Sequence, residues 1–96
     1  MTADTQSLLA PYRDQLNAID EKLVTLVAER LTICAQVAHT KRRHGIAMMQ
    51  PDRVEEVKSR CAKLGADQGL DPEFVRALYG LIIGEACALE DRIIER

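Results

Sequence analysis

The first half of the chain is a long run of helical periodicity with almost no helix breakers. Between about Thr5 and Arg43 there is no glycine, and the only proline, Pro11, lies near the start. Apolar side chains recur seven residues apart in two columns, as on one face of an amphipathic helix. The columns are Leu9, Leu16, Leu23, Arg30 and Val37, and then Tyr12, Ile19, Leu26 and Ile33. We therefore predict one helix of more than about 30 residues.

A helix of this length constrains how the chain can assemble. It would measure roughly 50 Å at about 1.5 Å per residue. The whole chain has 96 residues, and a compact domain of that size has a radius of gyration of only about 12–13 Å. One small domain cannot cover such an apolar stripe along its length. The sequence therefore predicts an intertwined homodimer, in which a second copy covers the stripe.

Two shorter helices are predicted after the long one, which ends in basic residues and the capping glycine Gly45. Pro51 fits the first position of a second helix that reaches about Ala66. Asp71-Pro72-Glu73 is a strong start for a third helix that runs to near Arg96. On the third helix we expect these side chains to point inward: Phe74, Leu78, Leu81, Ile82, Leu89 and Ile93. The predicted fold class is all-α, with a long, a short and a medium helix in a single domain over residues 1–96.

Composition excludes several classes of function. The net charge is −2, which argues against general nucleic-acid binding, and no apolar run approaches the roughly 20 residues of a membrane span. The N-terminus lacks the features of a signal peptide. Cys34, Cys61 and Cys87 are odd in number and far apart, which is typical of a reduced, cytoplasmic protein. His39 and His44 have no partners at metal-ligand spacing, so we expect no metal site.

Two cations share the apolar face of the long helix. Arg30 occupies a position of the leucine column, and Lys41 follows eleven residues later, which is about three turns and nearly the same direction. A guanidinium cannot lose its charge, so a buried arginine needs an anion. The pair predicts a water-poor pocket for a negatively charged small molecule.

Three further charged residues are candidates, each with a surface ion pair as the alternative. Arg53 is a cation at the start of a helix, a position that the helix dipole disfavours unless the side chain faces an anion. Glu90 continues an apolar stripe and could instead pair with a core arginine. Arg13, taken alone, is better interpreted as a surface residue. Because no nucleophile is evident, such a site would orient an anion and stabilise developing charge without covalent catalysis.

Several segments resemble the all-helical chorismate mutases over nearly the whole chain. The similar segments are Leu8-Leu9-Ala10-Pro11-Tyr12-Arg13, Ile19-Asp20-Glu21-Lys22-Leu23, Leu26-Val27-Ala28-Glu29-Arg30, Val37-Ala38-His39-Thr40-Lys41, Pro51-Asp52-Arg53 and Leu81-Ile82-Ile83 to Glu90. The resemblance implies a cofactor-free dimer with two shared active sites. Arg30, Lys41 and Arg53 would come from one protomer and Arg13 from the other. The arginines would bind the substrate carboxylates, and Lys41 would donate to the ether oxygen.

Two positions depart from the best-known members of that family. Val54 replaces a glutamate that meets the C4 hydroxyl of chorismate, and Glu90 replaces a glutamine that donates to the ether oxygen. A carboxyl can donate only when it is protonated. The segment from Arg43 to Val54 looks closest to the 4-amino-4-deoxychorismate mutases of antibiotic pathways. That resemblance implies that Gln50, Met49 and Val54 shape the pocket around C4, and Ala86 is a further expected substrate contact.

Other functions stay open on the sequence alone. The first alternative is a chorismate mutase that makes prephenate, and the second is an isochorismate pyruvate lyase, which shares the fold and a similar Pro-x-Arg-Val turn. A catalytically inactive regulatory or dimerisation bundle would turn over no chorismate analogue. A small nucleic-acid-binding dimer would use the basic run after Lys41, and its binding would depend on salt.

Overall fold

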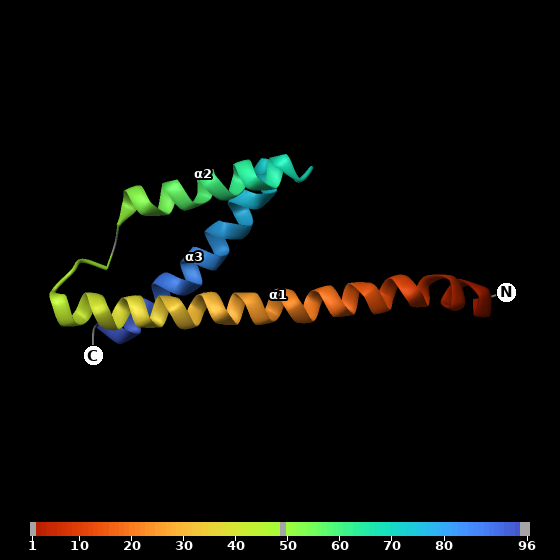
Figure 1. The fold of residues 1–96 in the computed structure, drawn as a ribbon, viewed down its shortest axis with the longest axis horizontal. Coiled ribbons are helices and arrows are strands. Elements are labelled where there is room, and N and C mark those ends of the chain that lie inside the picture. The colour runs from red at the N-terminus through yellow and green to blue at the C-terminus, as the bar shows by residue number, and fades with distance from the viewer. Residues whose placement is uncertain (1, 49, 95–96) are drawn as a thin grey trace. The chain divides into compact units, whose positions relative to one another are not determined.

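The computed structural model describes residues 2–48 and 50–94 of the chain. Helix α1 spans Thr2–His44, α2 spans Pro51–Asp67 and α3 spans Pro72–Ile94, and no strand occurs within the described ranges (Figure 1). The prediction of an all-α chain with a long, a short and a medium helix is confirmed. None of these helices is long and apolar enough, within the described residues, to cross a membrane.

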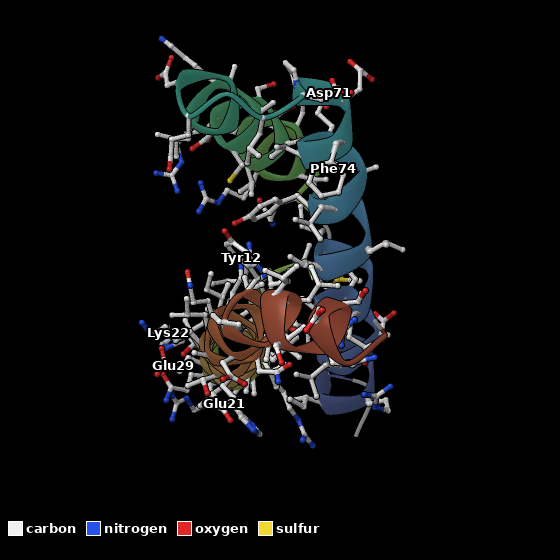
Figure 2. The ribbon with its side chains drawn as sticks, turned by 90° about the vertical axis from the view of Figure 1, so that its right-hand side faces the viewer. Tyr12, Glu21, Lys22, Glu29, Asp71 and Phe74 are labelled. Atoms are coloured by element: carbon white, nitrogen blue, oxygen red, sulfur yellow. The ribbon has the colours of Figure 1, made fainter. Side chains whose placement is uncertain are left out.

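The chain divides into two units, and the first contains α1 up to Arg30. Its apolar side chains are between 39% and 64% exposed at Leu9, Tyr12, Leu16, Ile19, Leu23 and Leu26. Figure 2 shows the charged side chains of Glu21, Lys22 and Glu29 projecting from other sides of α1 than Tyr12. This part of α1 is therefore amphipathic, and its own unit leaves the apolar stripe uncovered.

The second unit starts at Leu31 and contains the last turns of α1 together with α2 and α3. Its core is formed by Val57 and Cys61 on α2 and Val75 on α3, with Tyr79 and Ile83 packed against them. Figure 1 shows α3 leaving the end of α2 and running to the last turns of α1. This arrangement brings Glu90, near the C-terminal end of α3, within hydrogen-bond distance of Lys41 on α1.

Three local signals set the bounds of the helices. Gly45, directly after α1, has a φ of 64°, and Gly69, after α2, has a φ of 83°. Both lie in the left-handed region, where glycine pays no steric penalty and closes a helix end. At the start of α3 the Asp71 side chain accepts a hydrogen bond from the backbone N–H of Glu73 at 3.0 Å. The predicted boundaries at Gly45 and Asp71 are confirmed, and α2 ends at Asp67, next to the predicted end near Ala66.

The predicted inward face of α3 is wrong at three positions. Phe74, Leu78 and Leu81 are exposed, and the buried residues of α3 are Val75, Ala86 and Glu90. Helix α3 is apolar on two sides, and helical spacing alone cannot tell which side packs within the chain. The side that packs is the one carrying Tyr79, Ile83, Ala86 and Glu90.

Gly65 lies inside α2, where its lack of a side chain permits a close helix contact. A Cβ at this position would lie 2.6 Å from Cγ2 of Val75, which is buried. We expect Gly65→Ala to lower the free energy of unfolding by about 1–3 kcal/mol through overpacking. Urea denaturation measures the change. Gly84→Ala on α3 is the matched control, because no described atom lies within 4 Å of the added methyl group. A neutral or stabilising Gly65→Ala would contradict the close contact.

Candidate active site

Lys41 is the centre of a polar cluster in the second unit. Its Nζ donates to Oε1 of Glu90 on α3 at 3.0 Å and to the backbone carbonyl of Met48 at 2.9 Å. Glu90 lies 49 residues away in the sequence, so three segments of the chain meet at one ammonium group. Since an ammonium carries three N–H donors, one remains after these two bonds.

The ion pair is largely shielded from solvent. The side chains of Lys41 and Glu90 are 15% and 10% exposed. Ala38, one turn before Lys41, is fully buried, and Ala86, one turn before Glu90, is also buried. An ion pair in such surroundings has lost most of its hydration, and each charge depends on the other for compensation. The sequence places Glu90 on a mostly apolar stripe, and the structure shows Glu90 buried there. The ion pair that was the alternative to a ligand role is formed with a lysine instead of an arginine.

An open hollow of about 410 Å³ lies beside Lys41. Its volume falls within the range of small-molecule sites in proteins, roughly 300–1,000 Å³. The lining surface is mostly apolar, and Lys41 is the cation among the lining residues: Ile33, Gln36, Val37, Thr40, Lys41 and Ile46. Gln36 and Thr40 were not predicted from the sequence, because neither belongs to an apolar column or carries a charge. A hollow with apolar walls and one ammonium group suits a small anion with an apolar body.

A thiol lies in the electrostatic field of the ion pair. Burial raises the pKa of Cys87, and the negative charges of Glu90 and Asp91 raise it further, while Lys41 acts in the opposite direction. The thiol form of Cys87 is therefore favoured, and the side chain is a weak nucleophile at neutral pH.

The other predicted residues of the second unit lie around the start of α2. Arg53 is exposed and pairs with Oε1 of Glu56 at 2.8 Å, which is an ion pair on the helix surface. Gln50 is exposed, and its Nε2 donates to the carbonyl of Ala47 at 3.0 Å. Val54 is half-buried. Met49 lies outside the described residues.

The two remaining predicted residues belong to the first unit. Arg13 is exposed, and its guanidinium donates to Oε1 of Gln6 at 2.8 Å. Arg30, the last residue of that unit, is half-buried. Of the predicted catalytic residues, the structure brings Lys41 and Glu90 into direct contact.

The cluster can perform a limited set of chemical tasks. The ammonium of Lys41 can donate a hydrogen bond to an oxygen that gains negative charge, and Glu90 holds that ammonium in place. Within the described residues, no group of three or more histidine, cysteine, aspartate or glutamate side chains could hold a metal ion. Fold and site together define an all-helical protein with a shielded lysine beside an open hollow.

Comparison with known proteins identifies the family. The chain belongs to the chorismate mutase type II family, whose model matches residues 12–91. It is 43% identical to a 4-amino-4-deoxychorismate mutase of Streptomyces venezuelae over 95% of this chain and 88% of the relative. It is 45% identical to a 4-amino-4-deoxychorismate mutase of Streptomyces pristinaespiralis over 90% of this chain and 67% of the relative. A chorismate mutase of Methanocaldococcus jannaschii is 29% identical over 91% of this chain and 88% of its own length. The chain is an isomerase of this type, and the family predicted from the sequence is confirmed.

Proposed function

We propose that the protein converts 4-amino-4-deoxychorismate into 4-amino-4-deoxyprephenate by a [3,3] rearrangement. In this reaction the ether C–O bond breaks while a new C–C bond forms, and no proton is transferred overall. The ether oxygen gains negative charge in the transition state, so a fixed hydrogen-bond donor lowers the barrier. The observation that carries this proposal is the shielded Lys41, which lines a hollow and has one N–H left after two short bonds.

The proposed roles of the other residues follow the family resemblance. Arg30 and Arg53 bind the substrate carboxylates together with Arg13, which the partner protomer supplies. Glu90 holds Lys41 through the 3.0 Å ion pair. The side chain of Arg53 is 60% exposed and pairs with the carboxylate of Glu56. A substrate carboxylate can therefore reach Arg53 and take the place of the Glu56 carboxylate as its partner.

The homodimer is the second part of the proposal. Its support is the exposed apolar stripe of α1 in the first unit, where Leu9, Tyr12, Leu16, Ile19, Leu23 and Leu26 are between 39% and 64% exposed. Contiguous exposed apolar side chains of this extent mark an interaction surface in a folded protein. A second copy offers the same stripe, and a two-fold axis makes the two stripes self-complementary.

One sequence difference, at Val54, supports an amino group at C4 of the substrate. Val54 offers no hydrogen bond where a chorismate mutase carries a glutamate, and a polar group left unpaired in a closed pocket costs about 1–3 kcal/mol. A C4 amine is positively charged and needs an acceptor, which the connector can supply through a backbone carbonyl or Oε1 of Gln50. The names of the two relatives above 40% identity point to the same substrate.

Separate assays with 4-amino-4-deoxychorismate, chorismate and isochorismate test this assignment. We expect kcat/KM for the amino substrate to exceed that for chorismate by at least about tenfold, equivalent to roughly 1.4 kcal/mol. Product identification by mass spectrometry is part of the measurement, because release of pyruvate from isochorismate would indicate a lyase. Equal or better turnover of chorismate would sink the amino-substrate assignment and favour a mutase that makes prephenate.

A further inference from the structure

The connector between α1 and α2 is bonded to Lys41 at two points. The backbone carbonyl of Lys41 accepts a hydrogen bond from the N–H of Ile46 at 2.9 Å. The side-chain Nζ of the same residue donates to the carbonyl of Met48, also at 2.9 Å. The position of the connector and the direction of the ammonium group are therefore linked.

Gln50 fixes the connector from its other end. Its backbone carbonyl accepts from the N–H groups of Arg53 at 3.0 Å and Val54 at 3.2 Å, which starts α2. Its side-chain Nε2 donates back to the carbonyl of Ala47 at 3.0 Å. A carbonyl can bond only to the amide nitrogen of a glutamine, so this contact sets which end of the side chain faces the connector.

The carbonyls of Ala47 and Met48 are consecutive in the chain. Planar peptide bonds leave only two soft torsions between them, so a bond that holds the first carbonyl restricts the direction of the second. Gln50 holds the carbonyl of Ala47, and the carbonyl of Met48 holds Lys41. The side chain of Gln50 is thus coupled to the ammonium group of Lys41 indirectly, through the backbone of the connector.

We propose that Gln50 is a positioning residue for Lys41, acting through the carbonyls of Ala47 and Met48. A lysine has a flexible four-carbon stem, and one bond to Glu90 would leave its ammonium free to rotate. The second bond, to Met48, stops that rotation and gives the remaining N–H a fixed direction. This inference rests on the proposed function in one respect, which is that Lys41 donates to the ether oxygen.

The first test observes Lys41 without substrate. In the ¹⁵N-labelled native protein we expect a slowly exchanging ammonium signal, assigned by its loss in Lys41→Met. Gln50→Leu, which keeps the side-chain bulk but removes the amide, should broaden or abolish that signal. Gln50→Glu should do the same at neutral pH, because an ionised carboxylate cannot donate to Ala47. Gln68→Leu is the matched control, because it makes the same substitution at the other end of α2, away from the connector.

The second test measures turnover of 4-amino-4-deoxychorismate and chorismate by the same variants. We expect Gln50→Leu to lower kcat about five- to tenfold for both substrates by a common factor, the size of one lost hydrogen bond, with KM changed less than about twofold. An unchanged ammonium signal in both Gln50 variants would overturn the inference, and so would an unchanged kcat. A loss confined to the amino substrate, with Lys41 unaffected, would show that Gln50 acts at C4 instead. If Lys41→Met itself were fully active, the proposed function would fail while the ammonium signal still reported the contact.

Discussion

Replacement of Lys41 by alanine is expected to lower kcat/KM at least about 100-fold, which is the usual consequence of removing a preorganised transition-state donor. Lys41 is the one cation that lines the 410 Å³ hollow among the described residues, and two hydrogen bonds hold its ammonium. The loss should appear in kcat more than in KM, because the ether oxygen becomes charged only as the bond breaks. Steady-state kinetics with 4-amino-4-deoxychorismate provides the measurement.

Arg42→Ala is the matched control for this variant. Arg42 is the next residue along α1, carries the same charge, and makes a long 3.4 Å bond to the carbonyl of Ile93. We expect it to keep near-native activity. Lys41→Ala leaves the buried carboxylate of Glu90 without its cation, so folding must be checked by circular dichroism. Lys41 lies between that carboxylate and the open hollow, so its truncation to alanine makes room for water beside Glu90, and for this reason we expect the variant to fold. Near-native activity of folded Lys41→Ala would show that the site is misplaced.

The start and end of each helix could be predicted from local sequence signals. Proline at positions 51 and 72 and the capping residues Gly45 and Asp71 act within a few residues of themselves, so each marks a boundary without knowledge of the fold. The burial of Glu90 was readable for a similar reason, because Tyr79, Ile83 and Ala86 share its side of α3. In each case the information lies within one helix.

The contacts between segments could not be predicted from local sequence signals. The bond between Lys41 and the carbonyl of Met48 depends on the path of a six-residue connector, and a carbonyl carries no sequence signal at all. Phe74 and Leu81 were placed on the wrong side because α3 has two apolar faces. The packing of Gly65 against Val75 depends on the approach of two helices, although a buried glycine within a helical pattern is a signal for such a contact.

Restoration of activity by mixing two inactive variants is the second large effect that we expect. Arg13→Ala and Arg30→Ala should each reduce kcat/KM about 100-fold, since each removes a cation from a site that binds a dianion. Arg13 lies 17 residues before Arg30, which rotates it by about −100° on an ideal helix. The two side chains therefore point in different directions from α1, and a shared site requires that they come from different protomers.

A heterodimer of these two variants contains one site with both arginines and one site with neither. Subunit exchange between equal amounts of the variants should therefore return activity to about 25% of native, because half of the dimers are mixed and each mixed dimer has one intact site. The matched control is a mixture of Arg30→Ala and Lys41→Ala. Both residues serve the same site from one protomer in our proposal, so each site of that heterodimer carries a defect and no recovery is expected. Sedimentation of the native protein and the variants at micromolar concentration confirms that dimers are present to exchange. Failure of the Arg13 and Arg30 mixture to recover activity would argue against shared sites. Recovery in both mixtures would show that Arg30 and Lys41 of one protomer serve different sites of the dimer.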